Sequence, residues 1–233
     1  MPVYNEGEII RKTITQVESA VKIPHELLII YDMAKDSTIL PTKKLQKKYP
    51  SVKLVKNLYG RGALNALKTG LVKAKSKAVC VMMADLTDDP RIINTMMKKF
   101  EQGFDVIAAS RYMKGGHQMG GPIIKQLLSR GAGLSLHYFT GVPTRDVTNS
   151  FKIYSKKFLN KTKIESDGGF ELGIELTVKA HFGGYKVTEV PTTWRYLSKE
   201  SRFYLKKWLP KYLRWYFWAL NKKYLGNPII SEK

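Results

Sequence analysis

Short apolar runs alternate with longer amphipathic segments from the first residue to about residue 190 of this 233-residue chain. Such alternation is typical of repeated strand, helix, strand units, which build a mostly parallel sheet with helices on both faces. The sequence therefore predicts an α/β fold. The expected strands cover residues 26–31, 52–56, 78–83, 105–109 and 186–190, and helices are expected to begin near Glu6, near Arg61 and at Pro90 and to cover residues 170–181.

The net charge of the chain indicates which classes of partner it binds. Lys and Arg number 40 against 19 Asp and Glu, which leaves a net charge of +21. This excess favours an anionic partner, such as nucleic acid, acidic lipid or a phosphorylated substrate. Cys80 is the only cysteine, so a reducing compartment is favoured over an oxidising one. Neither a signal-peptide pattern nor a run of roughly 18 apolar residues is found, so neither secretion nor a membrane span is expected.

The start of the chain is unusual for such a fold. Residues 2–4 have the pattern of the end of a first strand, yet only Met1 precedes them. The first strand is therefore either very short or lacks residues upstream, and we hypothesise a truncated or misassigned start. Parallel sheets bind ligands at the carboxyl ends of their strands. The segments 4–6, 32–38 and 83–89 are expected at such ends.

An acidic turn follows the apolar run at residues 78–83. Asp85, Asp88 and Asp89 lie within five residues there, and clustered carboxylates suit Mg²⁺ or Mn²⁺ and, through the metal, a diphosphate. Asp88 and Asp89 are also well placed to cap a helix that begins at Pro90, and we favour that interpretation for these two. Asp85 follows the strand directly and is too early to cap, so it is the expected metal ligand.

A glycine segment, Gly60-Arg61-Gly62, also indicates phosphate binding. Asn65 occupies the place of the third glycine in the G-x-G-x-x-G dinucleotide pattern, so that pattern fails. Small residues here would equally let a helix lie close to the sheet. Arg61 remains a candidate contact for a donor phosphate.

An ordered set of motifs spans nearly the whole chain. It comprises Pro2-Val3-Tyr4-Asn5-Glu6, residues 32–38, Gly60-Arg61-Gly62, Ala84-Asp85-Leu86, Ser110-Arg111-Tyr112, residues 146–154, Glu175 and Glu189-Val190-Pro191. In this order the motifs resemble glycosyltransferase family 2, in the branch that includes the dolichol-phosphate mannosyltransferases. The resemblance implies a GT-A fold and transfer of a hexose, with inversion, from a nucleotide diphosphate sugar (GDP- or UDP-hexose) to a polyprenyl phosphate.

The resemblance also implies roles for individual residues. Asp85, Arg111 and Asp146 would be catalytic, and Asp85 would hold the metal. The implied donor-binding residues are Pro2, Tyr4, Glu6, Asp32, Arg61 and Asp85, and the implied acceptor-binding residues are Arg111, Lys125 and Glu175. A phosphate acceptor needs no strong general base, so the demand is for cations that hold two anions together. Arginine meets this demand with its planar fork.

Two positions depart from the family pattern. Met83 and Tyr31 occupy places where family members usually carry an acid. A thioether is a poor ligand for a hard cation, so Mg²⁺ or Mn²⁺ would rest on Asp85, the diphosphate and water.

The chain divides into residues 1–197, the expected GT-A domain, and a basic aromatic segment at residues 198–233. This segment holds nine Lys or Arg and nine aromatic residues. At about 100° per residue, apolar side chains from Leu209 to Leu220 share one side and cations the other. A helix at residues 210–225 would be about 24 Å long, which is too short to span a bilayer. It either packs on the domain or, as we favour, lies on a membrane surface, with the protein cytoplasmic and peripheral to the cytoplasmic face.

Two other functions compete with this interpretation. A basic nucleic-acid-binding protein would explain the charge but not the ordered motifs, so no nucleic acid is expected as a partner. A nucleotide-sugar-binding protein with impaired catalysis would explain Met83 and Tyr31.

Overall fold

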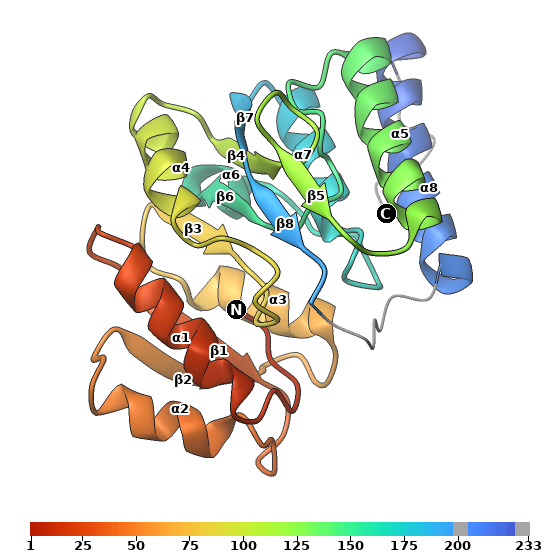
Figure 1. Cartoon of the computed structure of the whole chain (residues 1–233). Helices are drawn as coiled ribbons and strands as arrows, with labels where there is room; N and C mark the ends of the chain where they lie inside the picture. Colours follow the sequence, from red (N-terminus) through yellow and green to blue (C-terminus); the bar gives the residue numbers. More distant parts are fainter. Residues whose placement is uncertain (198–204, 227–233) are drawn as a thin grey trace.

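The structure, a computed structural model, describes residues 1–197 and 205–226 (Figure 1). The helices are α1 (Ile9–Ala20), α2 (Ile39–Gln46), α3 (Ala63–Lys73), α4 (Ile92–Glu101), α5 (Ile123–Thr140), α6 (Lys156–Lys161), α7 (Leu172–Phe182) and α8 (Leu205–Tyr224). The strands are β1 (Leu27–Tyr31), β2 (Val52–Lys56), β3 (Ala78–Val81), β4 (Val106–Ser110), β5 (His117–Met119), β6 (Lys152–Ser155), β7 (Val187–Pro191) and β8 (Thr193–Arg195). The five strands expected from residue 26 onward and each expected helix of the α/β region are present, with ends shifted by a few residues.

The strands form three separate sheets within the described residues. β1 pairs with β2 in parallel, β5 pairs with β8 in parallel, and a four-stranded sheet has the order β3-β6-β4-β7. In the larger sheet β4 and β7 are parallel, whereas β6 runs antiparallel to both β3 and β4. The expected first strand appears only as an isolated bridge between Pro2 and Ile30.

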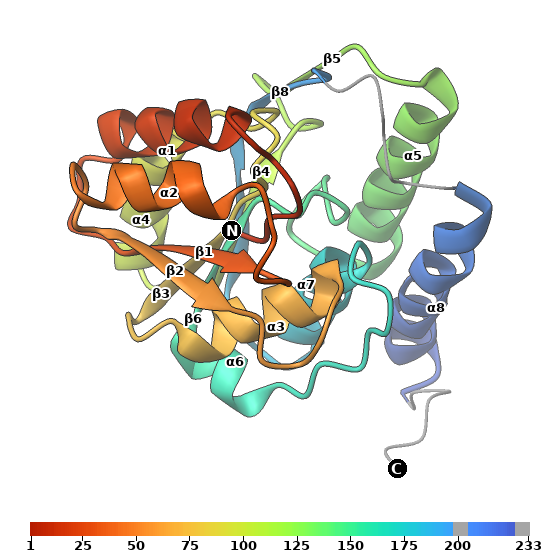
Figure 2. The ribbon, with the colours of Figure 1, turned by 90° about the horizontal axis from the view of Figure 1, so that it is seen from below.

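Helices cover both faces of these sheets. Helices α1, α2 and α4 lie on one face, and α3, α6 and α7 lie on the other (Figure 2). Val17 of α1 and Met96 of α4 pack with Ile107 and Ile153 on the first face. Leu67 of α3 packs with residues of α6 and α7 on the second. Two-sided burial explains why β4 is buried throughout and is apolar apart from Ser110.

Helices α5 and α8 lie side by side at one flank of the sheet (Figures 1 and 2). α8 is longer than the expected helix, because it begins before Pro210 and includes it. Trp208, Trp215 and Ala219 are buried, and Trp215 and Ala219 share a core with α5 and α7. This face of α8 therefore packs on the domain. Across the described parts of the chain, no helix has the combination of length and apolar character that crossing a bilayer requires.

Candidate active site

The ends of β1 and β2 are tied together by Asp32. Its carboxylate accepts hydrogen bonds from the Gly62 N–H at 2.9 Å and from the Asn57 side-chain amide at 2.8 Å. Gly62 has φ 123°, a conformation that favours glycine, directly before α3. Asp32 thereby holds the glycine segment at the strand ends, with Arg61 exposed beside it.

The amino-terminal segment is held against the same edge by the loop that follows β1. The Asp36 carboxylate accepts the backbone N–H groups of Asn5 at 3.1 Å and Thr38 at 2.8 Å. The Thr38 hydroxyl accepts the Glu6 N–H at 3.0 Å. Tyr4 is 42% exposed. The structure therefore brings Tyr4, Glu6, Asp32 and Arg61 to one edge of the sheet, where hydrogen bonds join residues 5–6 to the loop after β1 and join Asp32 to the glycine segment.

The acidic turn after β3 has a fixed shape. Asp85 is exposed, and its Oδ1 accepts the Thr87 N–H at 3.2 Å and the Thr87 hydroxyl at 2.7 Å. Leu86 has φ 62°, in the left-handed region that costs energy for a branched residue. The Thr87 carbonyl accepts the Arg195 N–H at 3.0 Å, so β8 is joined to the turn. Asp85 thus points outward from an ordered turn.

The two acids after Asp85 differ from each other. Asp89 lies at the start of α4, where its Oδ1 accepts the Arg91 N–H at 3.0 Å. Asp88 is only 6% exposed, and its Oδ1 has no hydrogen-bond partner among the described residues. Burial, and to a smaller extent the charge of Asp85, raise the pKa of Asp88 to about 7. The helix-cap interpretation is therefore wrong for Asp88, because its side chain turns into the protein instead.

The orphaned oxygen of Asp88 bears on the divalent metal that the family resemblance implies. A buried carboxylate oxygen without a partner is costly unless a cation or donor meets it. No group of three His, Cys, Asp or Glu side chains suited to a metal occurs among residues 1–197 and 205–226. Two carboxylates with a diphosphate and waters would complete the octahedral oxygen shell of Mg²⁺. Asp85 therefore fits such a metal and Met83 does not, and Asp88, whose pKa the charge of Asp85 raises, is close enough that we propose it as a second ligand.

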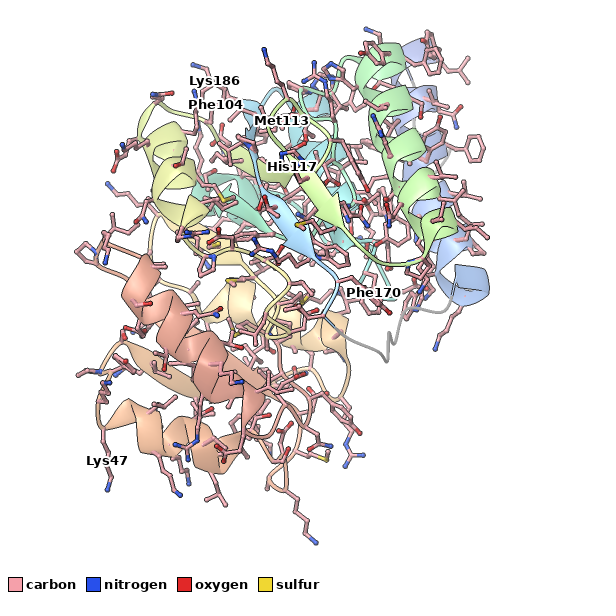
Figure 3. All side chains as sticks on the ribbon, viewed as in Figure 1. Lys47, Phe104, Met113, His117, Phe170 and Lys186 are labelled. Atoms are coloured by element: carbon pink, nitrogen blue, oxygen red, sulfur yellow. The ribbon has the colours of Figure 1, made fainter. Side chains whose placement is uncertain are left out.

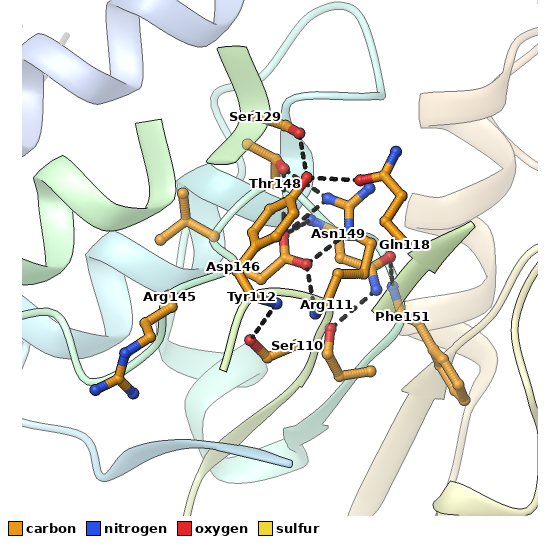
Figure 4. A network of polar contacts seen from close by, with 12 residues as sticks. Ser110, Arg111, Tyr112, Gln118, Ser129, Arg145, Asp146, Thr148, Asn149 and Phe151 are labelled. Carbon is orange, nitrogen blue, oxygen red and sulfur yellow. Dashed lines mark hydrogen bonds and ion pairs between the residues drawn. The ribbon is translucent and has the colours of Figure 1, made fainter. Parts of the chain in front are cut away.

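Arg111 and Asp146 form a buried ion pair beyond the acidic turn (Figure 4). Arg111 Nε donates to Asp146 Oδ2 at 2.7 Å, and Nη2 donates to Asp146 Oδ1 at 2.8 Å and to Thr148 at 3.0 Å. The guanidinium also lies 4.9 Å from the Tyr112 ring centre and 5.9 Å from that of Trp194. Burial alone would raise the pKa of Asp146, but Arg111 holds it below its ordinary value. Arg111 is thus oriented by a bidentate contact.

The ion pair is also connected to α5. The Tyr112 hydroxyl donates to Gln118 at 2.8 Å and makes a short contact with Ser129 of α5. The neighbouring residue Arg145 pairs with Glu189 of β7, Nη1 to Oε1 at 2.7 Å. One polar network therefore joins the ends of β4 and β7 to β5 and α5. In the sequence, the residues of this network belong to separate motifs.

Glu175 of α7 and Glu171, the residue before this helix, hold the loop that precedes α7. Glu175 is completely buried, and its oxygens accept the N–H groups of Glu165 at 2.6 Å and Ser166 at 2.9 Å. Glu171 accepts those of Gly168 at 2.7 Å and Gly169 at 2.9 Å. A Cβ at Gly169 would lie 2.9 Å from the Leu64 nitrogen, so the loop reaches the start of α3. Glu175 shapes this loop, and its contact with an acceptor stays a prediction.

The same loop meets α8. Phe170, labelled in Figure 3, packs edge-on against Trp208 with ring centres 4.9 Å apart. The Tyr212 hydroxyl donates to the Phe170 carbonyl at 2.6 Å, and Lys211 pairs with Asp167 at 2.8 Å. α8 is therefore attached to the loop that borders the glycine segment.

Lys125 and Arg195 lie on neighbouring elements. Lys125 is half-buried in the first turn of α5, after a turn in which a Cβ at Gly121 would be 3.4 Å from Tyr196. Arg195 is exposed at the end of β8, beside the acidic turn, and its charge lowers the pKa of Asp89 after the larger effect of Arg91. The family resemblance also implies a basic acceptor-side loop at residues 195–202, of which residues 198–202 lie outside the described residues.

Solved structures share this architecture. Glucosyl-3-phosphoglycerate synthase from Mycobacterium tuberculosis, in complex with uridine diphosphate, matches with a TM-score of 0.69 at 15% identity, over 94% of this chain and 78% of that one. The same enzyme with Mn²⁺, UDP-glucose and phosphoglyceric acid gives 0.68 at 16% identity, over 97% and 78%. At such identities the likeness shows the fold alone. That fold is the GT-A fold, as expected from the sequence.

The sequence of the chain then gives the family. The model of glycosyl transferase family 2 matches residues 1–163, well over half of the chain. The protein belongs to this family, which confirms the resemblance. Dolichol-phosphate mannosyltransferase of Pyrococcus furiosus is 26% identical over 219 residues, 92% of this chain and 60% of that protein. The uncharacterized glycosyltransferase YkcC of Bacillus subtilis is 27% identical over 217 residues, 90% and 64%. The chain spans less than two thirds of either relative.

Proposed function

We propose that this protein moves a hexose from a nucleotide diphosphate sugar, with inversion, to a polyprenyl phosphate at the cytoplasmic face of a membrane. The observation that carries the proposal is the attachment of the Arg111 and Asp146 network to α5, a helix with an exposed apolar stripe. In an amphiphilic acceptor, the phosphate would contact the Arg111 and Asp146 network, and the hydrocarbon chain would contact the apolar stripe of α5. The similarity to a dolichol-phosphate mannosyltransferase supports the same acceptor class.

The donor would lie along the edge formed by Tyr4, Glu6, Asp32 and the glycine segment. Backbone N–H groups and the exposed Arg61 suit its phosphates. Asp85 and Asp88 would hold a divalent cation there, and structures of the same fold contain Mn²⁺ or Mg²⁺ with UDP. Such a cation supplies charge neutralisation for the departing diphosphate.

The transfer step needs few groups from the protein. An oxygen of the acceptor phosphate forms a bond to the anomeric carbon while the bond from that carbon to the donor diphosphate breaks. Attack from the face opposite to the leaving group inverts the configuration. The acceptor is already an anion, so no proton has to be removed, and the protein's task is to hold two anions together. Arg111, which Asp146 orients, Lys125 and Arg195 are the cations we assign to the acceptor phosphate.

The membrane contact follows from two exposed stripes. On α5, Ile123, Ile124, Leu127, Leu128, Tyr138 and Phe139 are exposed, and on α8 and just beyond it Leu213, Phe217, Tyr224 and Leu225 are exposed. On α8 this stripe is opposite the buried Trp215, so the helix uses its tryptophans for docking on the domain. Isolated exposed apolar residues are ordinary, but two adjacent stripes with Arg130, Arg214 and Lys223 beside them suit an anionic bilayer surface.

A transfer assay tests the proposal. The protein is incubated with Mn²⁺, a radiolabelled GDP- or UDP-hexose, and vesicles that contain polyprenyl phosphate. We expect label in the lipid phase, in a product whose anomeric configuration is opposite to that of the donor. Asp85→Asn should abolish transfer without a change in circular dichroism. Turnover with water-soluble phosphates alone, and none with the lipid, would overturn the acceptor assignment.

The impaired-catalysis alternative is supported by Met83, which cannot replace a carboxylate as a ligand for a hard cation. It predicts tight binding of a nucleotide diphosphate sugar and no turnover with any metal. Calorimetric titration with the donor, run beside the transfer assay, separates the two functions.

A further inference from the structure

Two consecutive glycines in the loop before α7, residues 165–170, contact different helices. A Cβ at Gly168 would overlap the ring of Trp208 on α8. A Cβ at Gly169 would lie 2.9 Å from the backbone nitrogen of Leu64, in the first turn of α3. Neither position has room for a side chain. The loop is therefore packed between α8 and α3, as Figure 2 shows.

Helix α8 holds this loop through three contacts. The rings of Phe170 and Trp208 meet edge-on with centres 4.9 Å apart, and Trp208 is only 9% exposed. The Tyr212 hydroxyl donates to the Phe170 carbonyl at 2.6 Å. Lys211 Nζ donates to Asp167 Oδ1 at 2.8 Å. The three α8 side chains lie within about one turn of the helix, so one short stretch of α8 sets the position of the loop.

The two glycines move as a unit because one carboxylate binds both. Glu171, only 1% exposed, accepts the Gly168 N–H at 2.7 Å with Oε1 and the Gly169 N–H at 2.9 Å with Oε2. Charge-assisted bonds of this kind fix geometry as well as adding energy. A displacement of Gly168 by α8 is thereby passed to Gly169, and from there to Leu64.

The first turn of α3 in turn holds the glycine segment. The Asn65 side-chain amide donates to the Tyr59 carbonyl at 2.7 Å and to the Arg61 carbonyl at 3.3 Å. Leu64, the neighbour of Asn65, is buried in the core that α3 shares with α7. The position of this turn therefore determines where the exposed Arg61 side chain can reach.

We propose that α8 positions the donor site, and that Trp208 is its main positioning residue. The Trp208 ring fixes the loop before α7, the loop fixes the first turn of α3, and that turn fixes the glycine segment. Trp208 acts through these contacts and does not touch the donor. The inference rests on the proposed function, because it takes the glycine segment as the contact for the donor diphosphate. α8 is then part of the scaffold of the donor site and not only a surface for the bilayer.

Nucleotide binding by the full 233-residue chain gives the first test. UDP and GDP, each with Mn²⁺, are titrated calorimetrically into the unchanged chain and into Trp208→Ala. Trp218→Ala is the matched control, because it removes the same side chain from the same helix at a place where it packs against Phe182, with ring centres 5.8 Å apart. The Kd should rise by about fivefold or more in Trp208→Ala and by less than about twofold in Trp218→Ala. An unchanged Kd in Trp208→Ala, or an equal rise in both variants, would overturn the proposal.

A double-mutant cycle tests the route through the loop. Gly168→Ala adds a Cβ where the Trp208 ring lies, so it should weaken nucleotide binding by about fivefold or more. In the Trp208→Ala background the ring is gone, and the same glycine substitution should weaken binding by less than about twofold. Effects of the two substitutions that simply multiply would contradict a contact through Gly168.

Steady-state transfer separates positioning from a general loss of structure. Trp208→Ala should raise the KM for the donor by the same factor as the Kd. The kcat at saturating donor and the KM for the acceptor should change by less than about twofold, because the bonds from Arg111 to Asp146 and Thr148 stay in place. A fall in kcat with an unchanged KM for the donor would contradict the assignment.

Folding and the proposed function are checked separately. Circular dichroism and the Tm report whether Trp208→Ala folds. If it does not, Tyr212→Phe removes a single hydrogen bond between α8 and the loop and should raise the Kd by about twofold or more, so an unchanged Kd in that variant would overturn the inference. If the unchanged chain binds neither UDP nor GDP, the proposed donor site is wrong and this inference falls with it. Nucleotide binding that is equal in all variants overturns the inference alone.

Discussion

Arg111 and Asp146, 35 residues apart in the sequence, form a bidentate ion pair in which both side chains are at least nine-tenths buried. The Arg111 backbone N–H also donates to Asp146, at 3.0 Å. The carboxylate therefore fixes both the backbone and the side chain of Arg111. Because Asp146 is completely buried, we expect it to act on a substrate only through Arg111 and not by direct contact.

Loss of either partner should destabilise the fold. Arg111→Ala leaves the Asp146 carboxylate buried without its cation, which typically costs about 3–5 kcal/mol. Asp146→Asn keeps the shape of the side chain but leaves the Arg111 guanidinium buried without its counter-charge. Chemical denaturation measures the free energy of unfolding, and a loss below about 1 kcal/mol in both variants would contradict the buried pair. If Arg111 also contacts the acceptor, Arg111→Ala should raise the KM for acceptor more than the Kd for donor.

Lys152 should make stability depend on pH. It is completely buried, its ammonium donates to the Val147 carbonyl at 3.1 Å, and burial lowers its pKa to about 7, against a smaller opposing effect of Asp146. An unfolded lysine titrates near about 10.4. Between these values the unfolded chain binds more protons than the native one, so stability rises with pH. We expect a larger free energy of unfolding at pH 9 than at pH 7, and a smaller rise in Lys152→Met. Equal slopes would contradict the depressed pKa.

The sequence predicts the elements of this fold better than their pairing. Strand β6 was missed because Lys152 interrupts what would otherwise be an apolar run, and only the structure shows that this lysine bonds to backbone carbonyls. The turn that contains Asp85 could be predicted as a candidate metal site because it directly follows an apolar strand. Asp88 was misassigned because periodicity does not reveal that α4 begins at Ile92 and leaves this side chain turned inward.

The basic aromatic segment at residues 198–233 also shows that the sequence predicts elements better than their packing. Its amphipathic pattern predicts a helix, and α8 confirms it. The apolar side expected from that pattern ran from Leu209 to Leu220, yet Trp208, Trp215 and Ala219 are the residues that are buried. Which stripe faces the domain depends on the shape of α5 and α7, which no local pattern contains. The boundary at residue 197 stays a prediction, because residues 198–204 lie outside the described residues.

Two glycines of α5 should respond oppositely to alanine. A Cβ at Gly133 would lie 2.0 Å from the Arg145 carbonyl oxygen and 3.5 Å from the Asp146 Cα, whereas nothing lies within 4 Å of one at Gly131. Gly133→Ala should therefore cost about 1–3 kcal/mol and disturb the ion pair. Gly131→Ala should stabilise by roughly 0.5–1 kcal/mol, because alanine favours helix. Thermal unfolding of both variants checks this, and similar Tm changes would contradict the close approach at Gly133.

Asp88 and Asp89 should differ in their effect on metal binding. In calorimetric titration of Mn²⁺ with UDP present, Asp88→Asn should weaken metal binding by about tenfold or more, since it removes a charged ligand. Asp89→Asn is the matched control, because that carboxylate is bound to Arg91, and it should change little. Met83→Asp restores an acid at the usual family position and should recover binding in the Asp88→Asn background. Equal effects at positions 88 and 89, or no recovery, would remove Asp88 from the metal site.

The apolar stripe of α5 should be required for membrane binding. Ile123 and Leu127 are 72% and 65% exposed and lie one turn apart, so the double substitution Ile123→Glu and Leu127→Glu removes apolar contact and adds repulsion from anionic lipid without touching the core. Leu40 on α2 is 71% exposed, and Leu40→Glu is the control for a charge change at an equally open site away from α5. In sedimentation with vesicles that contain anionic lipid, the α5 variant should lose most of its binding and the α2 variant should keep it. Because both variants retain the polar site, transfer to a short-chain acceptor in detergent should survive in both. Equal loss of sedimentation would mean that net charge, and not this stripe, brings the protein to the bilayer.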